Sequence, residues 1–204
     1  MCNAAAGARA PADARDQVLG LLRHDFHRVL DDFQEFERLA AAEGGPACQR
    51  VVQRTFAELK VIAAVEEQVL YPALRDALDG TDLIDQSEIE HACIRRLIDD
   101  LEAAEPQRAD YPKEFRILGE HVRLHVKDEE LELFPALRDA EADWDRLCAD
   151  VRSCRAEMAE DLGIPHLAAA DDEPSGAATG PHYELPIGRA VIADGEVLDE
   201  TAEA

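Results

Sequence analysis

The 204-residue sequence is poor in basic side chains, in aromatic residues and in long apolar runs. Lys and Arg number 21 against 45 Asp and Glu, so the net charge of -24 argues against nucleic acid or an anionic membrane surface as the main partner. No apolar run is long enough to span a membrane, and the N-terminus lacks the apolar segment of a secretory signal. The five cysteines form no C-x-x-C motif, which indicates free thiols in a reducing cytoplasm.

Glycine and proline divide the chain into segments with helical periodicity, which predicts an all-α fold. The short connections between these segments favour antiparallel neighbours. We therefore expect an up-down-up-down four-helix bundle over residues 14–162, preceded by a disordered N-terminus, 1–13. The expected helices are 14–42, 47–78, 82–105 and 112–162, the fourth being extended and interrupted near Pro135.

Residues 163–204 differ in composition and are expected to form a flexible acidic tail. From residue 161 onward, ten acidic residues stand against Arg189 alone. Asp194-Gly195 is a dipeptide favoured in tight turns, so residues 189–200 are a candidate hairpin, which would need a surface to be stable. A protein partner could bind through this tail.

An internal repeat relates the two halves of the predicted bundle. The segment EEQVLYPALRDA, which starts at Glu66, aligns with EELELFPALRDA, which starts at Glu129, and nine of the twelve positions are identical at an offset of 63. The first and third helices follow at an offset of 65, which places Phe26 opposite His91. We therefore expect two similar helical hairpins about a pseudo-two-fold axis.

Four polar residues fall on the apolar faces of these helices: Glu66, His91, His125 and Glu129. Taken singly, each has an ordinary structural reading as a hydrogen-bonded core histidine, a solvated glutamate or half of an i,i+4 pair. A buried carboxylate is costly unless it is protonated, paired or bound to metal. Together, on facing helices, the four residues predict a shared cation, and imidazole with carboxylate suits iron, manganese or zinc.

The segments that carry these residues resemble the hemerythrin-like HHE cation-binding domain. The similarity covers roughly residues 15–142 and is most specific in the repeated E-E-x-x-x-[YF]-P-A segments. It implies a four-helix bundle with a non-haem di-iron centre that binds or senses O2 or NO, handles iron or repairs iron centres. It also implies a ligand set of one His each on the first and third helices and a His-x-x-x-Glu each on the second and fourth.

Two positions depart from that ligand set. Phe26 and Ile62 stand where the family has its first-helix and second-helix histidines, and both losses fall in the same half of the bundle. We therefore expect one metal position to be kept and the other to be filled with hydrocarbon. His27 is an alternative ligand if a bulge in the first helix turns it inward. His121, one turn before His125, is a further candidate, although a position at the bundle edge is slightly favoured.

The sequence thus predicts a cytoplasmic protein that binds non-haem iron, at a mononuclear site in preference to a di-iron site. Such a centre would sense or handle iron, O2, NO or peroxide, with manganese or zinc as alternative metals. One alternative function is a metal-free helical scaffold that acts through its acidic tail. Another is a mononuclear iron or manganese enzyme acting on peroxide or superoxide. No Ser-His-Asp, Cys-His or glycine-rich phosphate motif supports other catalysis.

Overall fold

The computed structural model is all-helical over the residues that it describes, with no strand among them. These residues are 13–42, 45–75, 77–78, 80–138, 140–164 and 167. All of them belong to one compact unit, Met1–Asp172, whereas a second unit, Glu173–Ala204, lies outside the described residues. The candidate hairpin at 189–200 and the N-terminus before Asp13 also lie outside them. In the described part of the chain, no helix has the length and apolar character needed to cross a bilayer.

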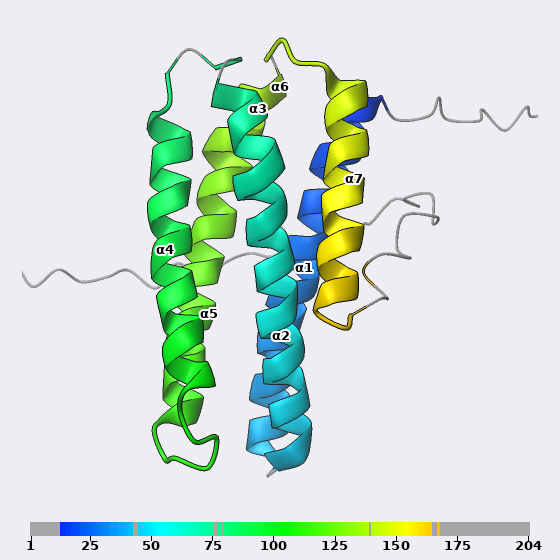
Figure 1. The fold of residues 1–204 in the computed structure, drawn as a ribbon. Coiled ribbons are helices and arrows are strands. Elements are labelled where there is room, and N and C mark those ends of the chain that lie inside the picture. Colours follow the sequence, from blue (N-terminus) through cyan, green and yellow to red (C-terminus); the bar gives the residue numbers. More distant parts are fainter. Residues whose placement is uncertain are drawn as a thin grey trace, which may run out of the picture. The chain divides into compact units, whose positions relative to one another are not determined.

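The first half of the bundle is a pair of long helical segments. α1 (Ala14–Ala41) begins after Asp13, whose side chain accepts a hydrogen bond from the Asp16 backbone N–H at 2.8 Å. α2 (Gly45–Val65) continues directly into a π-helical turn, η1 (Glu66–Leu70), and then into α3 (Tyr71–Arg75). α1 and α2 pack against each other (Figure 1).

The second half repeats this succession of elements. α4 (Asp82–Glu102) packs against α5 (Tyr111–Asp128), and α5 continues into a π-helical turn, η2 (Glu129–Leu133), and then into α6 (Phe134–Arg138). α5 also packs against α1, which joins the two halves. The sequence repeat is therefore also a repeat of backbone structure.

Each π-helical turn precedes a proline, and the two features are physically linked. Proline has no backbone N–H, and its ring clashes with the carbonyl four residues earlier in a regular helix. In the wider turns the Tyr71 N–H bonds to the Glu66 carbonyl and the Phe134 N–H to the Glu129 carbonyl, five residues back in both cases. Pro72 and Pro135 are thus accommodated without a break, although we expected an interruption at Pro135.

The predicted extension of the fourth helix is wrong, because a separate helix follows. α6 ends at Arg138, and α7 (Trp144–Asp161) begins after Asp143, whose side chain accepts a hydrogen bond from the Arg146 N–H at 3.1 Å. α7 packs against α1, α2 and η1 (Figure 1). An aspartate cap three residues after the repeated segment was the local signal for this new start.

One end of the core is packed with aromatic rings. Phe115 of α5 contacts Phe33, Phe36 and Phe56, with ring centroids 4.5 to 6.0 Å apart. Gly119 allows α5 to approach α1 closely there, because a Cβ at that position would lie 2.9 Å from the Phe33 ring. This aromatic cluster therefore joins α5 of the second half to α1 and α2 of the first.

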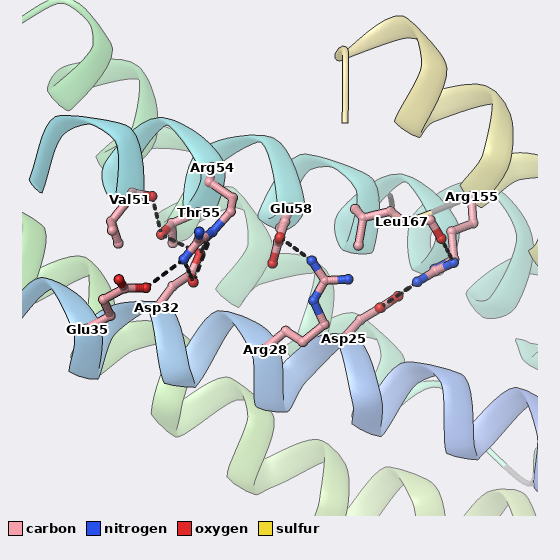
Figure 2. Close-up of polar contacts among 10 residues, drawn as sticks. All are labelled: Asp25, Arg28, Asp32, Glu35, Val51, Arg54, Thr55, Glu58, Arg155 and Leu167. Atoms are coloured by element: carbon pink, nitrogen blue, oxygen red, sulfur yellow. Dashed lines mark hydrogen bonds and ion pairs between the residues drawn. The ribbon is translucent and has the colours of Figure 1, made fainter. Parts of the chain in front are cut away.

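Ion pairs fill the seam that α2 and α7 form with α1 (Figure 2). Arg54 binds Asp32, and Arg28 donates to Glu58 with 2.6 Å between Nη2 and Oε1. Arg155 of α7 is fully buried and binds the buried Asp25 through two contacts of 2.8 Å. α7 therefore adds a buried charge pair to the first half of the bundle.

Candidate metal centre

Two glutamates of the repeat mark the level of the site in the bundle. Glu66 and Glu129 are the first residues of η1 and η2, and their exposed fractions are 0% and 1%. His91 of α4 and His125 of α5 are also buried. All four residues that the sequence placed inward are thus in the interior.

Two imidazoles and one carboxylate converge. His91 Nε2 lies 3.1 Å from His125 Nε2 and 3.1 Å from Glu66 Oε2, and His125 Nε2 lies 4.0 Å from that oxygen. The donor atoms of these three residues all lie within 4.8 Å of one another. Ligands about 2.0 to 2.2 Å from one ion are themselves about 3 to 4 Å apart, so the spacing suits a single cation.

The outer nitrogen of each imidazole contacts a further carboxylate. His91 Nδ1 lies 2.8 Å from Glu67 Oε1, and His125 Nδ1 lies 2.9 Å from Glu90 Oε2. The contact with His125 lowers the pKa of Glu90. A carboxylate at Nδ1 favours the Nδ1–H tautomer and leaves the Nε2 lone pair free for a metal. Both lone pairs are then directed at the same space.

Glu129 lies at the edge of this group and is held by a tyrosine. Its Oε1 accepts a hydrogen bond of 2.6 Å from the buried Tyr71 hydroxyl and lies 3.9 Å from His125 Nε2. The Tyr71 ring lies in the core, while its hydroxyl holds Glu129. The repeat makes this difference visible in the sequence, because the position equivalent to Tyr71 is Phe134, which has no hydroxyl.

Unpaired carboxylate oxygens show that the residues present suit a cation. Among the described residues, Oε1 and Oε2 of Glu66 and Oε2 of Glu129 have no hydrogen-bond partner. Loss of hydration raises the pKa of each carboxyl, to about 8 for Glu66 and to about 8 for Glu129. Buried carboxylates without partners take up a proton or bind a cation, and the adjacent imidazoles favour the cation.

The other two candidate histidines lie outside the group. The His27 side chain is 63% exposed, and its Nε2 lies 3.9 Å from Glu130 Oε1. His121 is exposed on α5. α1 is a regular helix at His27, without the bulge that would be needed to turn this side chain inward.

The equivalent positions in the other half carry no metal-binding atoms. Phe26 stacks on Phe134 and meets the His125 ring edge-on, with centroids 6.0 and 6.1 Å apart. Ile62 is buried on α2. A second ion would therefore have apolar side chains beside it at the two positions that are histidines in the other half.

The supporting carboxylates nevertheless have counterparts in that half. Asp25 is the equivalent of Glu90 at the offset of 65, and Glu130 is the equivalent of Glu67 at the offset of 63. With no imidazole beside it, Asp25 binds Arg155 of α7, and Glu130 lies near the exposed His27. The asymmetry thus extends beyond the two missing histidines. We did not predict these contacts of Glu67 and Glu90 from the sequence, although both residues have acidic counterparts in the repeat.

These features define a helical bundle with a buried histidine and carboxylate group of the kind that binds a metal cation. The hemerythrin HHE cation binding domain profile matches residues 18–137, which is more than half of the chain. The chain therefore belongs to the hemerythrin HHE cation-binding family, as the sequence motifs indicated.

A curated relative extends the similarity beyond the family domain. The chain is 23% identical over 155 residues to a protein named "DNA nickase" from Nostoc sp. (strain PCC 7120 / SAG 25.82 / UTEX 2576). The match covers 74% of this chain and 43% of the relative, so the chain spans less than half of that protein's length. No solved structure matches the chain significantly.

Proposed function

We propose that the protein binds one non-haem iron ion per chain through Glu66, His91 and His125, with Glu129 as a fourth ligand. The observation that carries the proposal is the convergence of two imidazole Nε2 atoms on a buried carboxylate without a hydrogen-bond partner. Two histidines and one carboxylate with open positions are the usual donor set of mononuclear non-haem Fe(II). Manganese and zinc accept the same donors and are the alternative metals.

The proposed role is sensing or handling of iron, O2, NO or peroxide. A bound ferrous ion would supply a redox-active centre with positions open to a small ligand. His91 and His125 would hold it, Glu67 and Glu90 would orient their rings, and Tyr71 would keep Glu129 close. A cytoplasmic location is part of the proposal, because the described cysteines (Cys48, Cys93, Cys148 and Cys154) are all free.

Two other functions remain alternatives to this one. A metal-free scaffold would act through the acidic tail, and a mononuclear iron or manganese enzyme would act on peroxide or superoxide. The relative's name adds nicking of DNA, but a net charge of -24 opposes binding to phosphate backbones. The buried donor group favours metal binding over the first alternative and over DNA chemistry.

The test is metal analysis of the purified chain after chelation and reloading with Fe(II). We expect about one iron per chain, lost in His91→Ala and His125→Ala and retained in His27→Ala and His121→Ala. Two irons per chain, with one removed by His27→Ala, would contradict the single site. No bound metal under any loading condition would leave the scaffold function as the better explanation.

A further inference from the structure

A cavity of about 190 Å³ adjoins the candidate metal centre. Its walls come from α1, α2, η1, α4 and α5, and they include His91 and His125. Phe26 and Ile62, which replace the two missing imidazoles, also line it. The half that was expected to be filled with hydrocarbon is therefore lined with hydrocarbon and hollow. Phe26 leaves this space open because its ring stacks on Phe134.

The character of the lining changes from one end to the other. Ile94, Ile98, Val122 and Val126 are buried and apolar, and they adjoin the two imidazoles. The more exposed lining residues include Lys60 and Arg95, whose side chains are 35% and 48% exposed and mark the opening. An apolar chamber thus leads from solvent to the histidines.

Both basic side chains among the described lining residues are paired with carboxylates, so neither is free to attract an anion. Lys60 Nζ lies 2.6 Å from Glu102 Oε1, and Arg95 pairs with Glu67. The strongly negative chain would also repel anionic ligands. An anion is therefore disfavoured at this entrance, and the apolar walls disfavour any charged molecule further inside.

We propose that this cavity binds a neutral, mainly apolar organic molecule of about one ring, placed against His91 and His125. An engineered apolar cavity of about 150 Å³ binds benzene, so 190 Å³ accommodates a single ring with a small substituent. The proposal goes beyond iron binding, because the walls of the cavity are formed by protein side chains alone and do not require a metal.

The first measurement uses fluorobenzene as the probe and follows its 19F resonance on titration with the full chain. We expect saturable binding with similar affinity in chelated and Fe(II)-loaded protein. Absence of binding would overturn the proposal. Binding that requires Fe(II) would place the probe on the metal and would also overturn it. Failure of the chain to take up iron would contradict the metal proposal alone and leave this titration valid.

Variants that fill the cavity provide the second measurement. Ala63 is a half-buried lining residue of α2, so Ala63→Val and Ala63→Leu place methyl groups in the cavity without removing any proposed metal ligand. We expect fluorobenzene affinity to fall progressively, by at least about tenfold in Ala63→Leu, with iron content unchanged. Ala57→Leu is the matched control, since Ala57 is also half-buried on α2 and does not line the cavity. Equal affinity in Ala63→Leu and Ala57→Leu would exclude this cavity as the binding site.

Discussion

At the scale of single residues, each imidazole of the candidate centre is held by a carboxylate on Nδ1. These contacts decide which nitrogen carries the proton, and so they prepare Nε2 as a ligand. Removing the charge at Nδ1 weakens both the orientation and the basicity of the ring. Glu67 and Glu90 should therefore matter for metal affinity although neither is a proposed ligand.

We predict that Glu67→Gln lowers Fe(II) affinity about 10- to 100-fold, as removal of such outer partners generally does. The matched control is Glu130→Gln, the same substitution at the equivalent position of the repeat, where no imidazole is buried. Competition titration with a coloured chelator would measure both affinities. Similar losses in the two variants would indicate a general charge effect instead of support for His91.

The raised pKa values of Glu66 and Glu129 give the metal-free protein a distinctive pH dependence. Each carboxyl has a reference value of 4.5 and a folded-state pKa of about 8. Between these values the folded chain binds more protons than the unfolded chain. We therefore predict that these two groups lower the free energy of unfolding as pH rises from about 4.5 to about 8.

Urea unfolding of chelated protein across that pH range would measure the effect. Glu129→Gln removes one of the two groups while keeping an oxygen that can accept from Tyr71, so its curve should be flatter. An unchanged slope in this variant would show that Glu129 does not titrate with a raised pKa.

At the scale of elements, we predicted helix over the residues of α7 but not its separate start or its packing on the first half. Its main polar contact joins Arg155 to Asp25, 130 positions earlier, and helical periodicity carries no information on such pairs. The π-helical turns were also missed, because hydrophobic spacing does not show one extra residue in one turn. By contrast, the proposed ligands Glu66, His91, His125 and Glu129 could be placed inward, since their positions continue the apolar stripes of their helices.

We predict that Arg155→Met destabilises the protein by about 3 to 5 kcal/mol, because it leaves Asp25 charged and buried without its partner. Arg152→Met is the control: Arg152 lies almost one turn earlier on α7, is exposed, and should change stability by only about 0.5 kcal/mol. Chemical denaturation would give both values. Adding Asp25→Asn to Arg155→Met should recover part of the loss, and no recovery would mean that the cost comes from packing.

At the scale of the whole molecule, the two hairpins have the same succession of helices and π-helical turns. They differ in the side chains that they bury and in the packing of α7. The second half supplies both histidines of the metal-type group, while the first half supplies Glu66 and carries the ion pair with α7. The cavity lies between them, and its walls come from both halves. The repeat predicted both halves and their asymmetry. It could not predict the cavity, which depends on how side chains from five elements pack, or the use of Asp25 by α7.

We predict that Phe26→His combined with Ile62→His creates a second iron position. Polar rings in an apolar layer should destabilise the chelated protein by a few kcal/mol, and Fe(II) should reverse the loss by binding the folded state. Arg155 competes for Asp25, so the second ion should bind more weakly than the first. Elemental analysis and thermal unfolding would test this. Metal content equal to that of the parent would show that the alignment of the halves is wrong.

The position of α7 has a consequence for the motions of the protein. α7 packs on α1, α2 and η1, and no contact of α7 with α4 is among the principal ones. Chelation should therefore loosen the two hairpins unequally: amide hydrogen exchange should accelerate in α4 and α5, while α1 and the first part of α2 remain protected by α7. Mass spectrometry of deuterated peptides would measure this, and uniform acceleration across all four helices would contradict it. The hairpin of α1 and α2 is thus stabilised by the packing of α7, whereas we expect the hairpin of α4 and α5 to depend on the bound cation for part of its stability.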